Sequence, residues 1–280
     1  MKWIINDLRG FYIDFKRKSS PNKLSCDITN WRQFAKIVRK NDKRLLQELP
    51  NFPNAILVTG CQRSGTTVMA RIFTQSKGMV NYWSGFDDEL DAALILSGVE
   101  PGLHQGRYCF QTTYLNEYYQ EYINTPDSVK IIWVLRNPVD VVNSMLNNWR
   151  SLALWELYTS CGHQGNDLSV RKKISPLSFP FKRLEIACLS YSGKLSQLLE
   201  LSSIFPTNKL LVINYEDLME KERNVLPKIF EFINLKYDSS YALKLKKTSK
   251  TPVSNILKVD IEKYCGSIYE EAKKLSTLNL

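Results

Sequence analysis

The sequence predicts an α/β fold: a doubly wound, mainly parallel sheet with helices on both faces. Three short apolar runs, at 55–59, 129–135 and 209–215, carry this prediction, because each is followed by a segment with helical periodicity. A continuous apolar run is typical of a strand buried on both faces. Strands that alternate with helices form parallel β-α-β units, and such sheets bind ligands at the carboxyl ends of their strands.

The helices are expected directly after these strands. The periodicity predicts them at 68–75, at 139–149 and from 216 through 232. Asn137 is a suitable N-cap for the second of these helices, because its side chain can accept a hydrogen bond from the first turn. The first fifty residues read as basic helices, in which apolar residues such as Trp31 and Phe34 recur at helical spacing.

Length and composition exclude several classes of protein. The 280 residues are 44% hydrophobic and 24% charged, and no apolar run reaches the ~18–20 residues of a membrane-spanning helix. We therefore expect no transmembrane segment and a single domain over 1–280, in which 1–54 is a basic helical N-terminal extension. The six cysteines form no C-x-x-C pair and only two histidines are present. This pattern predicts no metal site and reduced thiols in a cytoplasmic protein.

The formal net charge of +10 lies at the two ends of the chain. Residues 1–50 hold 12 basic and 5 acidic side chains and residues 236–280 hold 9 and 5, whereas the middle holds 17 and 18. A basic surface favours an anionic partner, although solvated lysines on amphipathic helices also explain it. The chain has no recognisable nucleic-acid-binding motif, so we do not expect a nucleic-acid partner.

The segment after the first strand reads as an anion-binding loop. Gly60-Cys-Gln-Arg-Ser-Gly-Thr-Thr67 has the spacing of the P-loop pattern G-x-x-x-x-G-K-[ST] at both glycines and at the last threonine. Backbone N–H groups in such a turn bind phosphate or sulfate, assisted by the helix dipole. The P-loop lysine is replaced by Thr66, and the cation is Arg63 inside the loop. This replacement counts against a magnesium-dependent kinase.

A second anion site is predicted after the strand at 129–135. Arg136 ends that strand and Ser144 lies two helical turns further on, so both can face one pocket. An arginine fork donates two parallel hydrogen bonds to a phosphate, and a serine hydroxyl adds a third. A capped helix start is the alternative explanation of Arg136. Together with the first loop, these residues predict a pocket with two anion sites.

Four motifs in this order resemble those of the sulfotransferases that use 3′-phosphoadenosine 5′-phosphosulfate (PAPS). The segment 62–67 resembles their 5′-phosphosulfate loop, and 136–144 resembles their 3′-phosphate motif. The segment 213–218 resembles a strand-end motif near the adenine, and 247–249 resembles a later segment that touches the nucleotide. The resemblance covers roughly 55–250.

The resemblance implies transfer of a sulfuryl group from PAPS to an acceptor hydroxyl, with 3′-phosphoadenosine 5′-phosphate (PAP) as product. The cofactor-binding residues that it implies are Arg63, Ser64, Gly65, Thr66 and Thr67 for the phosphosulfate, Arg136 and Ser144 for the 3′-phosphate, and Tyr215 and Thr248 towards the adenine. Arg63 is also expected to act in catalysis by neutralising charge on the leaving oxygen. Arginine at this position resembles the carbohydrate- and tyrosyl-protein-modifying branches, which tilts the expected acceptor towards a carbohydrate.

Glu89, and after it Asp88, is expected to be the base that deprotonates the acceptor. The carbohydrate- and protein-modifying branches use a glutamate after the first helix, where this chain has Asp88-Glu89. Desolvation by Trp83 and Phe86 would raise the pKa of such a carboxylate towards a useful value. The acidic first turn of a helix explains the same residues, and His104 is the rival base.

The chain departs from the cytosolic branch of the family at several points. Tyr114 stands where that branch has its catalytic histidine, and a tyrosine with a pKa of about 10 is a poor base. The Arg-Lys-Gly that closes over the 3′-phosphate has no match, and Lys246, Lys247 or Lys250 are the candidate substitutes. A P-loop kinase and a non-catalytic binder of anions or nucleic acid are the alternative functions.

Overall fold

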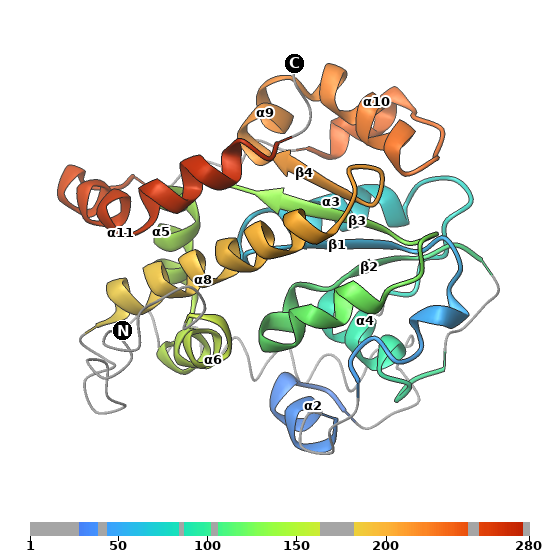
Figure 1. The fold of residues 1–280 in the computed structure, drawn as a ribbon, viewed down its shortest axis with the longest axis horizontal. Helices are drawn as coiled ribbons and strands as arrows, with labels where there is room; N and C mark the ends of the chain where they lie inside the picture. Colours follow the sequence, from blue (N-terminus) through green and yellow to red (C-terminus); the bar gives the residue numbers. More distant parts are fainter. Residues whose placement is uncertain are drawn as a thin grey trace.

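Four parallel strands form one sheet in the order β2-β1-β3-β4 (Figure 1). The computed structural model describes residues 28–38, 44–83, 87–101, 106–162, 182–245 and 252–276. The strands are β1 (Ile56–Gly60), β2 (Cys109–Gln111), β3 (Lys130–Leu135) and β4 (Leu210–Asn214). The three predicted strands are confirmed as β1, β3 and β4. β2 was not predicted, because three residues are too few to show a period.

The order of the strands reverses at β1. The chain passes from β1 to β2 on one side and then returns to β3 on the other, so Val58 pairs with both Gln111 and Ile132. In α/β sheets, ligands bind at such a switch point, outside the carboxyl ends of the strands. The carboxyl ends of β1 and β3 carry the two predicted anion-binding loops.

Helices cover both faces of the sheet and surround its edges (Figure 1). The α-helices are α2 (Trp31–Ile37), α3 (Thr66–Thr74), α4 (Asp88–Leu96), α5 (Pro138–Asn148), α6 (Ser151–Cys161), α8 (Arg183–Ile204), α9 (Tyr215–Glu220), α10 (Glu222–Phe232) and α11 (Asn255–Lys273). Three 3-10 helices are described as well: η2 (Leu49–Asn51), η3 (Thr113–Asn124) and η5 (Ser239–Lys244). The helices predicted after the three strands are confirmed as α3, α5 and the pair α9 and α10.

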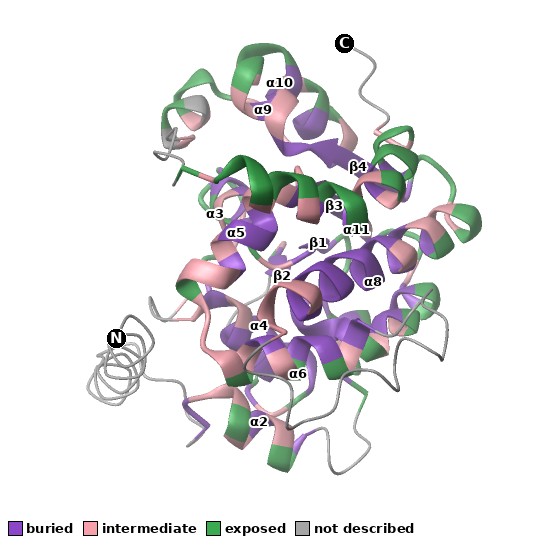
Figure 2. Cartoon of the chain, turned by 90° about the vertical axis from the view of Figure 1, so that its left-hand side faces the viewer, coloured by how far each residue is buried: buried purple, intermediate pink, exposed green. Residues whose placement is uncertain are grey.

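Alternate residues of the strands enter two hydrophobic clusters, one on each face of the sheet. Leu57 and Trp133 belong to a cluster with α4, α5, α6, α8 and α11, whereas Val58 and Val134 belong to one with α3, α9 and α10. The strands are buried except at Lys130, the half-buried first residue of β3, and exposed residues gather on the outer helices (Figure 2). Burial on both faces explains why the strands are continuous apolar runs, and it confirms the predicted doubly wound fold.

Local capping follows the sequence at the helices that begin near the switch point. Asn137 caps α5 as predicted, since its side chain accepts a hydrogen bond from the backbone N–H of Val139 at 2.9 Å. Asp87 caps α4 in the same way through the N–H of Leu90. The acidic first turn of α4 is therefore a genuine helix start, and it also carries Glu89.

The described part of the chain bears on two further expectations. None of its helices is both long and apolar enough to cross a membrane. Five of the six cysteines are described, and all five are buried free thiols, as expected for reduced cysteines. Cys26 lies outside the described residues.

Candidate functional site

The loop between β1 and α3 has a tightly specified backbone. Arg63 has a φ of 74°, and Gly65, which precedes α3, has a φ of 97°. A Cβ on Gly65 would lie 2.4 Å from Cε2 of Tyr215, so glycine allows that ring to pack against the loop. Ser64 is fully buried, and its Oγ has no partner among the described residues. A buried hydroxyl without a partner is costly, so the loop fits a bound oxyanion.

Gly65→Ala is expected to lower the free energy of unfolding by about 2–3 kcal/mol, because it adds both backbone strain and a clash with Tyr215. Urea unfolding measures this loss. Gly78→Ala is the matched control: Gly78 has a φ of 88°, but an added Cβ meets nothing within 4 Å. The control should lose only the strain contribution of about 1 kcal/mol. Equal losses in the two variants would show that the Tyr215 contact does not constrain the loop.

The ends of β1 and β3 bring Arg63 and Arg136 together. Arg63 donates from Nε to Oγ of Ser144 at 3.0 Å, and Arg136 donates from Nη1 to the carbonyl oxygen of Arg63 at 3.2 Å. Desolvation, followed by repulsion from Arg136, lowers the pKa of Arg63. Two neighbouring guanidinium groups repel each other, so a bound anion would stabilise this arrangement.

Arg136 is held in a defined position at the end of β3. Its guanidinium lies over the ring of Tyr215, 4.6 Å from the centroid, and its Nη2 is 3.6 Å from Oδ2 of Asp140. Its carbonyl oxygen accepts a hydrogen bond from Oη of Tyr191 at 2.8 Å. The buried Nε of Arg136 has no partner among the described residues. This side chain therefore keeps a donor available for a ligand.

Glu89 is connected to the anion-binding loop through residues at the carboxyl end of β2 and just after it. One carboxylate oxygen accepts a hydrogen bond from Oγ1 of Thr113, and the other lies 3.5 Å from Nε2 of Gln111. The same amide nitrogen donates to Oγ1 of Thr66 at 3.2 Å. Gln111 thus links Glu89 to the start of α3, which fixes the carboxylate relative to the loop.

Asp88 belongs to a different environment from that of Glu89. It is buried and pairs with Arg71, whose Nη2 and Nε lie 2.8 and 3.1 Å from Oδ2 of Asp88. The guanidinium of Arg71 also lies over the ring of Trp83, 5.2 Å from its centroid. Trp83, which was expected to desolvate the base, therefore packs on the ion-pair partner of Asp88. Phe86 lies outside the described residues.

The carbonyl oxygen of Thr113 is a second connection between the loop and the protein interior. It accepts hydrogen bonds from Nε2 of Gln62 at 3.1 Å and from Nζ of Lys194 at 3.0 Å. Lys194 lies on α8 and is buried, and desolvation lowers its pKa. Gln111, Thr113 and Lys194 were not predicted to belong to the site. The one available signal was that polar residues follow a short apolar segment, Cys109-Phe110.

Tyr114, which the sequence resemblance aligns with a catalytic histidine, lies in an environment that makes it a poor base. Burial raises the pKa of Tyr114 well above its ordinary value of 10. The rival base His104 lies outside the described residues, as do Thr248 and the candidate substitutes Lys246, Lys247 and Lys250.

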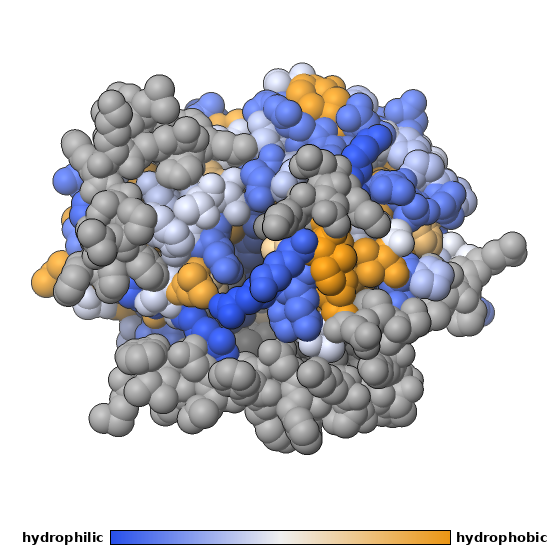
Figure 3. All heavy atoms as spheres, turned by 90° about the horizontal axis from the view of Figure 1, so that it is seen from below, coloured by the Kyte–Doolittle hydropathy of each residue, from blue (hydrophilic) through white to orange (hydrophobic). Residues whose placement is uncertain are grey.

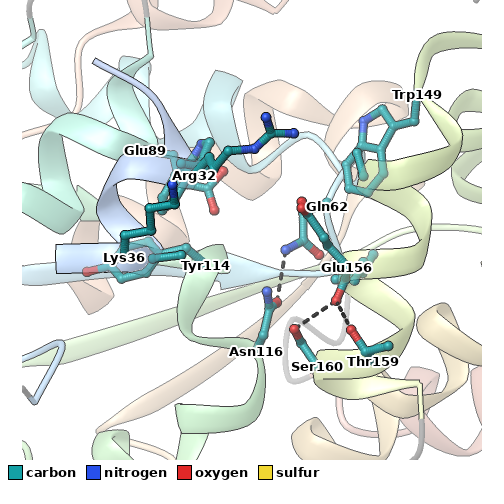
Figure 4. Close-up of a pocket in the computed structure, with 14 residues that line it drawn as sticks. Arg32, Lys36, Gln62, Glu89, Tyr114, Asn116, Trp149, Glu156, Thr159 and Ser160 are labelled. Atoms are coloured by element: carbon teal, nitrogen blue, oxygen red, sulfur yellow. Dashed lines mark hydrogen bonds between the residues drawn. The ribbon is translucent and has the colours of Figure 1, made fainter. Parts of the chain in front are cut away.

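A cavity of about 600 Å³ opens beside Glu89 (Figure 4). Its walls come from α2, the anion-binding loop, α4, η3, the end of α5 and α6. The lining residues are Trp31, Arg32, Ala35, Lys36, Gln62, Glu89, Tyr114, Asn116, Trp149, Ala153, Glu156, Leu157, Thr159 and Ser160. Gln62 precedes Arg63 in the anion-binding loop, and Glu89 is linked to that loop through Gln111, so the cavity lies beside the loop. Asp88 does not line it.

A parallel sheet with two adjacent arginine-bearing loops at its switch point defines an α/β protein with a candidate site for an oxyanion ligand. Residues 53–274 match the family model of the sulfotransferase domain. The match spans most of the chain, and the protein belongs to the sulfotransferase family.

Three solved structures to which the chain is similar are also sulfotransferases. They are a domain of the Synechococcus PCC 7002 olefin synthase (12% identity, TM-score 0.47, 82% of this chain and 96% of that chain), an enzyme from Alicyclobacillus acidocaldarius (16%, 0.45, 81% and 97%) and mouse SULT7A1 complexed with PAP (19%, 0.41, 74% and 69%). A comparison with curated protein sequences returned no match.

Proposed function

We propose that the protein transfers a sulfuryl group from PAPS to an acceptor hydroxyl, with a carbohydrate as the favoured acceptor. The observation that carries the proposal is the contact of Arg63 with Ser144, beside the contact of Arg136 with the Arg63 carbonyl group. Family membership supports sulfuryl transfer. Two adjacent guanidinium groups support a donor that carries two separate anionic groups, as PAPS does.

The side chains around these arginines fit such a donor. Ser64 and Arg136 each keep a buried polar atom that has no partner within the described ranges, and both atoms are donors suited to a phosphate or sulfate oxygen. In the proposed assignment, the loop with Ser64, Thr66 and Thr67 binds the phosphosulfate. Arg136 and Ser144 bind the 3′-phosphate, and Tyr215 and Thr248 lie towards the adenine.

When bound, PAPS supplies a sulfuryl group that is already activated for transfer. Glu89 accepts the proton of the acceptor hydroxyl, because its carboxylate lines the cavity and Thr113 holds one of its oxygens. Arg63 presents a fixed positive charge at the loop, where it stabilises negative charge that develops during transfer. The positions of both groups are set by the strand ends before the acceptor binds.

Titration with PAP and with AMP tests the proposed donor site, because only PAP has a 3′-phosphate. We expect PAP to bind more tightly than AMP, and Arg136→Ala to weaken PAP binding by about 10- to 100-fold, the loss expected for charge-assisted hydrogen bonds. The affinity for AMP should change much less. Isothermal calorimetry measures both ligands.

Arg223→Ala is the matched control, because Arg223 is an exposed arginine on α10. This variant should leave PAP binding unchanged. Equal affinity of the native protein for PAP and AMP would contradict the proposal. Magnesium-dependent ATP turnover would instead support the kinase alternative, and strong salt-dependent nucleic-acid binding without a need for the 3′-phosphate would support the binder.

A further inference from the structure

We infer that the acceptor is a polyhydroxylated ring that carries an anionic substituent, and that α2 binds this substituent. The inference rests on the proposed function, because it concerns the acceptor cavity beside Glu89. α2 lies before residues 53–274, which match the family model. Its contribution to the cavity is therefore a feature of this chain outside the matched domain.

Two cations of α2 carry the inference. Arg32 and Lys36 are four residues apart, so they lie on one face of the helix, and both line the cavity (Figure 4). Both are exposed, and within the described ranges neither forms an ion pair with a carboxylate. Hydrophilic side chains gather in the middle of the face seen from below, the side on which α2 lies (Figures 1 and 3). An anionic group in the cavity would meet both cations.

α2 is fixed relative to the proposed base. Nε1 of Trp31 donates to Oδ2 of Asp87 at 3.0 Å, and Asp87 caps the helix that carries Glu89. The Trp31 ring also packs against the ring of Tyr114 at 5.6 Å between centroids, and Phe34 is fully buried on the inner face of the helix. The helix that carries the two cations is therefore anchored to the start of α4, which carries Glu89.

The opposite wall of the cavity favours hydroxyl groups. Glu156 on α6 lines this wall with Thr159 and Ser160 (Figure 4), and Gln62 adds a buried Oε1 that has no partner in the part of the chain that the structure describes. Carboxylate, hydroxyl and amide oxygens accept hydrogen bonds from ring hydroxyls. The half-buried side chains of Trp149 and Trp31 supply apolar indole surface to the cavity for the C–H face of a ring.

The four charged groups that line the cavity orient such an acceptor. Glu89 and Glu156 repel an anion, whereas Arg32 and Lys36 attract it. The anionic substituent is therefore expected at α2 and the hydroxyl-bearing edge at α6, with one hydroxyl at Glu89. A neutral ring of the same shape would lack the contacts with α2.

The test compares two probes, p-nitrophenyl β-D-glucuronide and p-nitrophenyl β-D-xyloside. They have the same three ring hydroxyls and differ by one carboxylate. Binding of each probe to the PAP-saturated native protein is measured by ligand-observed NMR at low ionic strength, and sulfuryl transfer to each is followed from PAPS. We expect about fivefold or greater preference for the glucuronide, since two exposed charge pairs each contribute a modest gain. The preference should decline at high salt.

The double variant Arg32→Gln, Lys36→Gln should abolish the preference and leave the affinity for PAP unchanged. The double variant Lys221→Gln, Arg223→Gln is the matched control, because it removes the same two charges from exposed positions on or beside α10. The control should keep the full preference. Thermal unfolding of both variants shows whether α2 still packs.

The remaining outcomes separate a failure of the acceptor inference from a failure of the proposed donor site. If PAP binds but the glucuronide is not preferred, either because both probes bind equally or because neither binds, the acceptor inference is overturned and the proposed donor site stands. A preference that survives in the Arg32→Gln, Lys36→Gln variant also overturns it. If the native protein does not bind PAP, the proposed function is overturned, and the inference with it.

Discussion

Replacing Arg63 by alanine is expected to reduce sulfuryl transfer by about 10³-fold or more, because the variant loses the cation that stabilises developing negative charge. The side chain donates to Ser144, and its carbonyl oxygen accepts from Arg136. The substitution therefore also removes a contact between the two anion-binding loops. Single-turnover transfer from PAPS measures the chemical step, and PAP titration measures binding separately.

Backbone strain is the competing explanation for such a loss, because Arg63 has a positive φ of 74°. Arg63→Asn is the matched variant, since asparagine tolerates the left-handed region but carries no charge. It should lose as much transfer as Arg63→Ala. Arg63→Lys should retain part of the activity, because it keeps a charge without the planar fork. Near-native transfer by Arg63→Asn would show that the charge has no catalytic role.

Glu89→Gln is expected to lower turnover by about 10²- to 10⁴-fold, the range for loss of a general base. The amide has the shape of the carboxylate and can still accept from Thr113, but it does not take a proton. The affinity for PAP should be unchanged, because Glu89 lies on the acceptor side of the site.

Asp88→Asn is the control from the adjacent position. Asp88 pairs with Arg71 and does not line the cavity, so the substitution should lower the free energy of unfolding and leave turnover close to native. Breaking one partner of a buried charge pair typically costs about 3–5 kcal/mol, with less expected here because Arg71 is half exposed. A fully active Glu89→Gln variant, or an inactive but stable Asp88→Asn variant, would show that Glu89 is not the base.

The sequence was most informative where the signal is local. The strands at β1, β3 and β4 were predicted because burial on both faces demands a continuous apolar run. The anion-binding loop and the N-cap at Asn137 were also predictable, because each depends on the types of a few residues that are adjacent in the sequence. These features locate Arg63 and Arg136 at two strand ends without any knowledge of tertiary contacts.

Other parts of the site depend on contacts between distant segments. Glu89 and Asp88 are neighbours in sequence, yet successive helical side chains point about 100° apart, and only the packing of α4 directs one of them to the cavity. Gln111 ends a strand of three residues and Thr113 lies just after it, and three residues are too few to reveal a period. Their role at Glu89 becomes visible only once β2 pairs with β1.

The sequence alone determined the parallel α/β fold, the anion-binding loop after β1 and the arginine after β3. Each of these features depends on residues that lie close together along the chain. Tertiary structure alone decided that Arg63 contacts Ser144, that Asp88 turns to Arg71, and that α2 forms a wall of the cavity beside Glu89. These contacts join segments separated by up to 81 residues. Their existence depends on how the helices pack on the sheet, which the periodicity of a single segment does not encode.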